Sequence, residues 1–213
     1  MAGPRSVIGV DLGQKEDYTA IAVINTRHDQ DQVCEIVALK RLPVGTTYTT
    51  VVETLLEIKK NPQLRSADLV VDATGVGRPV VDFLWNAGLC PVAVSIHGGD
   101  SVSSSRDRYL ELRVPKRDLI ANLQVLVQNR LIRINPKTQN ARLLANELQN
   151  IRVRIDPRTA HDSYGAWREG EHDDLVLAVA IAAWYARYIQ SLHIRSDSLA
   201  SEYWKVRYFV AGV

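Results

Sequence analysis

Cysteine is scarce in this sequence, with two residues in 213, Cys34 and Cys90. Without neighbouring cysteine or histidine ligands, two cysteines exclude a zinc site of the usual kind. Both lie in apolar, strand-like segments, so we expect core thiols in a reducing cytosol.

Long hydrophobic runs are also missing. The longest apolar run, residues 175–185, falls short of the ~18–20 residues that cross a bilayer, so we expect no membrane segment and no membrane partner. Residues 1–5 lead directly into a strand-like segment, which argues against a secretory leader. The chain has neither an internal repeat nor a low-complexity tract.

What is present is typical of a globular protein: 46% apolar and 23% charged residues. The length suits one large domain or two small ones. The net charge of +2 hides a basic middle, since residues 101–170 hold 13 Lys and Arg against 7 Asp and Glu. Such a distribution is a mild indication of a polyanionic partner.

The first half predicts a mixed sheet. Three strands with short gaps, typical of an antiparallel meander, are expected at 6–13, 18–26 and 32–42. An alternation of helix and strand, typical of parallel crossovers, follows at 49–60, 68–72, 78–87 and 91–96. The predicted fold class is therefore α/β, with helices flanking the sheet.

The second half adds a Gly- and Ser-rich loop, three helices and a hairpin. We expect them at 97–105 for the loop, 116–129, 138–149 and 171–190 for the helices, and 151–167 for the hairpin. Residues 1–190 are expected to form one domain. The tail, 191–213, is left unplaced.

Acidic residues stand at three conspicuous points. Asp11 and Asp72 each end an aliphatic strand, where a carboxylate is costly to bury unless something binds it, and Asp173 and Asp174 open an apolar helix. Each also has a structural interpretation. Asp11 or Asp72 could cap the next turn, the latter through Thr74, and the helix acids could favour the helix dipole.

Taken together, these acids predict a metal site. If the first and fourth strands are parallel neighbours, Asp11 and Asp72 lie side by side, and the helix that begins at Asp173 can pack across them. Converging carboxylates repel one another unless a cation neutralises them, and oxygen ligands suit Mg²⁺ or Mn²⁺. Two such ions ~3.5–4 Å apart can act on a phosphodiester.

Four segments carry a resemblance to a known family: VIGVDLG, VVDATGVGRPVVDFL, VPKRDLIANLQVLVQNRLIRI and REGEHDDLVLAVAIAAW. The order of strands and acids resembles the ribonuclease H-like nuclease superfamily. The amino-acid sequences of the four segments resemble, more narrowly, the C-terminal nuclease domain of tailed-phage large terminase subunits, over about residues 6–190.

This resemblance implies a metal-dependent endonuclease that cuts double-stranded, concatemeric DNA during genome packaging, in the cytoplasm of the bacterial host. It implies Mg²⁺ or Mn²⁺ as cofactor; we expect two ions, with a single ion as the alternative. The partners it implies are an ATPase motor domain, a portal and a small terminase subunit.

The catalytic and metal-binding residues that the resemblance implies are Asp11, Asp72, and Asp174, Asp173 or both. Asp174 is favoured because Glu171 lies one helical turn before it, where a second acid can assist. We expect His172 to support the site or the helix start rather than to bind metal.

The chain departs from a complete large terminase in having no G-x-x-x-x-G-K-[ST] motif. Residues 75–79 have the glycines but no Lys followed by Ser or Thr, so we expect no ATPase here. The sequence leaves open whether the chain is an excised domain or a naturally separate one.

Seven basic residues are candidate DNA contacts: Lys15, Arg78, Lys116, Arg117, Arg152, Arg154 and Arg158. Arg152 and Arg154 alternate with aliphatic residues and share one strand face, which could equally be a solvated polar face. The sequence has no helix-turn-helix or zinc-finger signature, so we expect salt-sensitive phosphate binding with little base readout.

Three other interpretations remain open. An actin-like ATPase or sugar kinase fits residues 8–13 but needs a second Asp-Gly-rich loop and a longer chain. A Holliday-junction resolvase has a helix acid pair with the spacing of Glu171 and Asp174. The third is a non-catalytic DNA-binding module of this fold.

Overall fold

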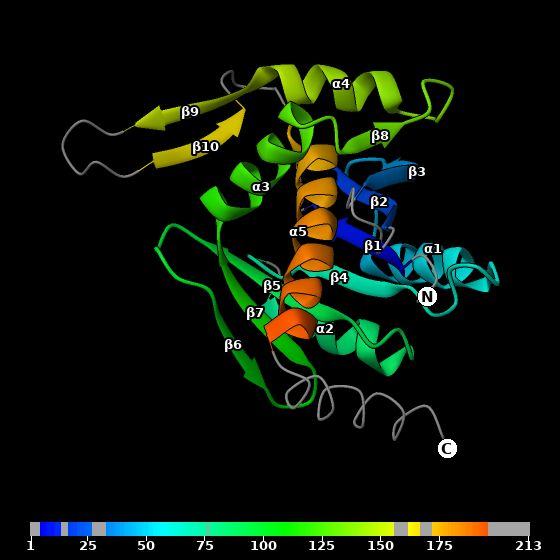
Figure 1. Ribbon diagram of the computed structural model, residues 1–213. Helices are drawn as coiled ribbons and strands as arrows, with labels where there is room; N and C mark the ends of the chain where they lie inside the picture. The colour runs from blue at the N-terminus through cyan, green and yellow to red at the C-terminus, as the bar shows by residue number, and fades with distance from the viewer. Residues whose placement is uncertain are drawn as a thin grey trace.

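In the computed structural model, eight strands form one mixed sheet in the order β6-β7-β5-β4-β1-β2-β3-β8 (Figure 1). The structure describes residues 5–13, 17–26, 33–75, 77–155, 162–166 and 172–195, with the backbone alone at 77–78, 151–155, 162–166 and 193–195. The strands are β1 (Arg5–Asp11), β2 (Thr19–Thr26), β3 (Cys34–Leu42), β4 (Asp68–Asp72), β5 (Val92–His97), β6 (Ser103–Arg106), β7 (Leu110–Pro115) and β8 (Ile132–Ile134).

The pairing follows the sequence-based expectation. Strands β1, β2 and β3 are antiparallel neighbours, whereas β1, β4, β5 and β7 run parallel. The predicted fold class, α/β with an antiparallel three-stranded meander followed by parallel strands and flanked by helices, is confirmed, as is the parallel pairing of the first and fourth strands.

Helices cover both faces of the sheet (Figure 1). They are α1 (Tyr48–Lys60), α2 (Gly77–Asn86), α3 (Lys116–Gln128), α4 (Ala141–Asn150) and α5 (Asp174–Arg195). Side chains of β1 alternate between the two layers, as in any strand. Ile8 and Val10 pack in the core under α1, and Val7 packs in the core under α3, α4 and α5.

Two expectations for the middle of the chain are wrong, and two strands there were not predicted. The loop expected at 97–105 ends in β6, which pairs with β7. The unpredicted strands are β7 itself and the short β8, which follows α3. All four residues of β6 are exposed and polar, so no apolar pattern marks them as a strand. Cys90 is exposed in a turn with φ +46°, whereas Cys34 is buried as expected.

The predicted hairpin has its two strands, β9 (Ile151–Ile155) and β10 (Asp162–Ala166), in a separate antiparallel sheet that projects beyond α4 in Figure 1. Its register pairs Arg152 with Gly165 and Arg154 with Ser163. The backbone positions of the two arginines therefore fall on one face of β9.

Helix α5 differs from expectation in length and in apolar content. It continues to Arg195, and its segment Asp174–Leu192 is long and apolar enough to cross a membrane by length and composition alone. However, 72% of that window is buried inside the protein. Its apolar surface is thus used by the core, as the central helix over the sheet in Figure 1.

Gly9 allows α5 to approach the sheet closely. A Cβ atom built at this position would lie 2.1 Å from the Ala178 carbonyl oxygen and 2.8 Å from the Ala182 Cβ. Real Cβ atoms do not make contacts this short with backbone. The helix therefore sits against β1 only because that strand carries no side chain here.

Replacing Gly9 with alanine should push α5 away from β1. We expect the Gly9→Ala variant to lose about 2 kcal/mol of unfolding free energy, the cost of overpacking a filled core, measured by urea denaturation. The matched control is Gly98→Ala, where nothing lies within 4 Å of the added Cβ. Equal stability of both variants would contradict the close packing.

Candidate metal centre

Two carboxylates lie next to each other where parallel strands β1 and β4 end. Val10 pairs with Val71, and Asp11 and Asp72 are the next residues of the two strands. Because side chains alternate along a strand, both aspartates fall on the face that α5 covers. The sequence-based prediction that these two strand ends adjoin is confirmed.

Asp72 is also held by the turn that follows it. Its side chain is 8% exposed, and its Oδ1 accepts a hydrogen bond of 2.8 Å from the backbone N–H of Thr74. The structural interpretation of Asp72 as a turn cap is therefore correct. It does not exclude a role in a site, because this bond fixes the carboxylate orientation.

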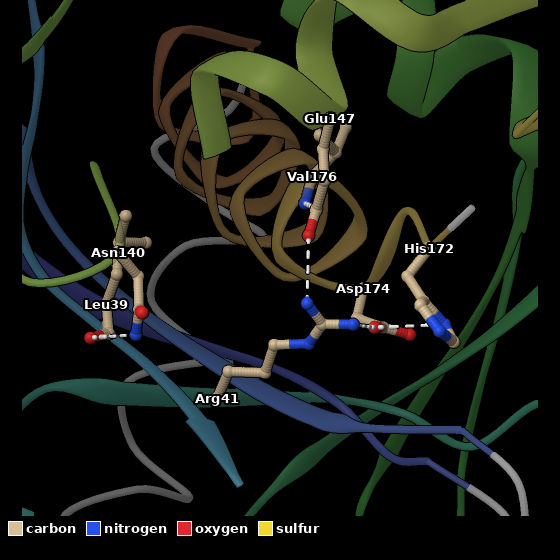
Figure 2. Close-up of polar contacts among 7 residues, drawn as sticks. All are labelled: Leu39, Arg41, Asn140, Glu147, His172, Asp174 and Val176. Atoms are coloured by element: carbon tan, nitrogen blue, oxygen red, sulfur yellow. Dashed lines mark hydrogen bonds and ion pairs between the residues drawn. The ribbon is translucent and has the colours of Figure 1, made fainter. Parts of the chain in front are cut away.

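The helix acids stand at the first turn of α5. The carbonyl of Asp173 accepts the N–H of Leu177 at 2.8 Å, which makes Asp173 the residue that caps the helix start. A further first-turn N–H, that of Val176, donates to Glu147 Oε2 of α4 at 3.1 Å (Figure 2). Glu147 thereby ties α4 to the helix end that carries Asp173 and Asp174.

Arg41 is a site residue that sequence reasoning missed. Its guanidinium lies 3.1 Å from Asp174 Oδ2 and 3.9 Å from Glu147 Oε1 (Figure 2). It also covers the Tyr18 ring at 3.5 Å from the centroid, a cation–π contact. The register of the β1–β2–β3 meander brings Arg41 there, since Arg41 pairs with Ala20 and Ala20 pairs with Asp11.

His172 lies beside this ion pair. Its Nδ1 is 3.8 Å from Asp174 Oδ2, and its ring meets the Tyr18 ring edge to face at 4.8 Å. These contacts place His172 beside the start of α5, and its supporting role stays a prediction. Asp174 itself is 5% exposed, and its Oδ2 has no hydrogen bond of good geometry, so Arg41 holds it by charge.

Lys116 and Arg117 begin α3 beside the same edge of the sheet, but their partners differ. Lys116 Nζ lies 3.5 Å from Asp173 Oδ2. Arg117 lies 2.5 Å from the Asp100 carboxylate and 3.6 Å from that of Asp118. Of these two residues, Lys116 is the one that contacts an acid of the cluster, Asp173.

Burial and neighbouring carboxylates shift the pKa values in this cluster. Burial raises the pKa of Asp11 well above its usual range, and three neighbouring carboxylates raise it further: those of Asp72, Asp174 and Asp173. Burial also raises the pKa values of Asp72 and Asp174, which Lys116 and Arg41 respectively lower. The cluster thus brings several carboxylates together where they are largely shielded from solvent.

Burial likewise raises the pKa of Glu147 to about 7, although its hydrogen bond from Val176 and the charge of Arg41 both lower it. Two buried acids therefore share one guanidinium. The positive charge of Arg41 lowers the pKa of both acids.

The donor chemistry of the cluster fits a hard divalent cation. It consists of carboxylate oxygens, which Mg²⁺ and Mn²⁺ prefer, and one of them, Asp174 Oδ2, is buried without a hydrogen bond. Among the described residues, however, no three acidic, histidine or cysteine side chains are arranged to hold one ion. Instead, Arg41 forms an ion pair with Asp174, and Lys116 forms one with Asp173.

Several predicted site residues cannot be placed. Lys15, Arg158 and Glu171 lie outside the described residues, and at Arg78, Arg152 and Arg154 only the backbone is described. Their proposed roles rest on sequence alone.

Solved structures share this fold. The magnesium-bound large terminase nuclease of thermophilic phage G20c is 23% identical, with a TM-score of 0.62 over 86% of this chain and 82% of that one. The manganese-bound nuclease domain of the bacteriophage SPP1 large terminase is 13% identical, with a TM-score of 0.54 over 84% of each chain.

The large terminase of bacteriophage HK97 matches at 14% identity and a TM-score of 0.57, over 86% of this chain but 40% of that protein. No family model matches the sequence, and no curated protein does. The resemblance to terminase nuclease domains is thereby confirmed at the level of fold.

Loss of Arg41 should leave two buried carboxylates without a cation. We expect Arg41→Met to cost about 3 kcal/mol of unfolding free energy, typical of breaking a buried pair, measured by urea denaturation at neutral pH. Lys40→Met, at an exposed position of the same strand, is the control. Adding Glu147→Gln to Arg41→Met should restore part of the loss; a further fall would contradict the shared-cation interpretation.

Proposed function

We propose that this protein is a divalent-metal-dependent endonuclease that hydrolyses phosphodiester bonds of double-stranded DNA, and that it cuts concatemeric phage DNA during packaging in the bacterial host's cytoplasm. The observation that carries the proposal is the crowding of Asp11, Asp72, Asp173 and Asp174 at one edge of the sheet; burial raises the pKa of Asp11, and the other three carboxylates raise it further. The shared fold of terminase nuclease domains supports it.

Asp11 and Asp72, with Asp174, Asp173 or both, would hold Mg²⁺ or Mn²⁺, two ions in our proposal. A bound ion of this kind activates a water molecule and stabilises the leaving oxygen. The chain supplies the orientation. Thr74 fixes the Asp72 carboxylate, and Arg41 fixes that of Asp174.

Binding of the duplex would use cations around the acidic cluster. Arg117 is 43% exposed at the start of α3, and the β9–β10 hairpin carries Arg152 and Arg154 on one strand face. Contacts of this type bind phosphates without reading bases. Lys15, Arg78 and Arg158 belong to the same proposal.

The size of the chain relative to the HK97 large terminase, of which it matches 40%, favours an ATPase motor domain as a partner. A portal and a small terminase subunit would complete the packaging assembly. Residues 1–190 would then act as one nuclease domain.

Incubation with supercoiled plasmid tests the proposed activity. We expect cutting with Mn²⁺ or Mg²⁺, none with EDTA and little with Ca²⁺, because hydrolysis needs tight ion geometry. Asp72→Asn should abolish cutting without unfolding the chain, as should Asp11→Asn and Asp174→Asn. Asp82→Asn, a partly exposed carboxylate on α2, is the matched control.

Full activity in any of the three site variants would remove that residue from the site. A folded wild-type chain that never cuts, with any of these ions, would contradict a self-sufficient nuclease. Preference for a four-way junction over duplex would favour a resolvase, and metal-independent binding without cutting would favour a non-catalytic module.

The hairpin contact predicts a specific salt dependence. The Arg152→Ala, Arg154→Ala double variant should bind duplex more weakly and lower the slope of log K against log salt by about 2, one unit per lost phosphate contact. Filter binding in Ca²⁺ over a salt series measures this slope. An unchanged slope would mean that these arginines form a solvated face.

A further inference from the structure

We propose that Lys116 is a displaceable counter-cation of the acidic cluster: its ammonium holds Asp173 until a divalent ion takes the carboxylates, and it then binds a phosphate of the DNA. This inference rests on the proposed function for its second step. The first step concerns the metal-free protein and is independent of DNA.

The position of Lys116 is the first argument. Its Nζ lies 3.5 Å from Asp173 Oδ2, which is ion-pair distance and long for a hydrogen bond, and its side chain is 30% exposed. Its charge also reaches Asp11 and Asp72, whose pKa values it lowers. One ammonium group thus acts on acids from β1, β4 and the start of α5.

Helix electrostatics provide the second argument. A positive charge at the N-terminus of a helix is unfavourable, because the helix dipole is positive there. Two adjacent cations begin α3, and each needs acids nearby to compensate. Arg117 has Asp100 and Asp118, whereas the acids near Lys116 are those of the candidate metal centre.

Lysine chemistry makes exchange possible. An ammonium on a flexible stem is a mobile point charge, unlike the planar guanidinium of Arg41, which is packed on Tyr18. Among the described residues, no three acids are arranged around one ion, and Lys116 lies at ion-pair distance from Asp173 Oδ2. A divalent ion that takes this oxygen would replace the ammonium and release Lys116 beside the cluster, where a phosphate would approach.

The first arm of the test uses Mn²⁺ alone, without DNA. Lys116→Met should bind Mn²⁺ about fivefold more tightly by calorimetry, because one competing positive charge is gone. In EDTA it should melt at a lower temperature than the wild type, since the acids lose their counter-cation. Lys116→Arg should restore the melting temperature, and Arg117→Met is the matched control with unchanged Mn²⁺ affinity.

The second arm measures binding of a short duplex in EDTA and in Ca²⁺. Lys116→Met should change the affinity little in EDTA, where Asp173 holds the ammonium, but weaken it about fivefold in Ca²⁺, as expected for one lost phosphate contact. The Arg117→Met variant should weaken binding by the same factor in both conditions.

An unchanged or weaker Mn²⁺ affinity in Lys116→Met, or an equal gain in Arg117→Met, would overturn the counter-cation role. A Lys116→Met effect on DNA affinity that is equal in EDTA and Ca²⁺ would overturn the transfer to phosphate. If the Mn²⁺ arm gives the expected result but the wild-type chain neither binds nor cuts DNA, the proposed function fails while the counter-cation role stands.

Discussion

Mutual repulsion among carboxylates is the constraint that organises this protein. Asp11 and Asp72 end adjacent parallel strands on the face covered by α5, and that helix begins with Asp173 and Asp174. Partial burial reduces the screening of these charges by water, so their repulsion is stronger than at the surface. The arrangement is therefore tolerable only with cations nearby, and Arg41 and Lys116 approach the helix acids from different elements, β3 and the start of α3.

The packing that creates this repulsion is itself specific. Gly9 lets the α5 backbone lie against β1, closer than any side chain would allow. Glu147 then accepts an N–H from the first turn of α5, so α4 fixes the same helix end. A fold that served only stability would not gather five acids around one helix start, because removing such charges from water is costly. The cost is understandable if the cluster exists to bind a cation.

The sequence was a good guide where the argument was local. Aliphatic runs that end in aspartate identified β1 and β4, and short gaps predicted the antiparallel meander. The parallel pairing that adjoins Asp11 and Asp72 was considered only as an arrangement open to such a mixed sheet, and the structure has it. Strand β6 was missed because its four residues are exposed and polar. Strand β7 was missed although Leu110, Leu112 and Val114 alternate along it. Arg41 and Glu147 were missed for another reason: their importance arises from the register of β3 and the docking of α4, which a pattern of residue types does not specify. Lys116 was recognised as a cation, but its acidic partner Asp173 is 57 residues away.

The two cations are suited to different tasks. Arg41 lies between two buried carboxylates and over an aromatic ring, and a guanidinium stays charged in any accessible condition. Its contacts would have to break together for it to leave, so it acts as a fixed part of the fold that sets the position of Asp174. Lys116 has a partly exposed side chain, and among the described residues its ion-pair partner is the Asp173 carboxylate. A fixed cation preserves the site when no metal is bound, whereas a mobile one can give way to the metal without disturbing the helix. If the cluster binds a divalent ion as proposed, arginine and lysine at these two positions would meet two requirements at once, an acidic site that is stable when empty and one that is still available to the ion.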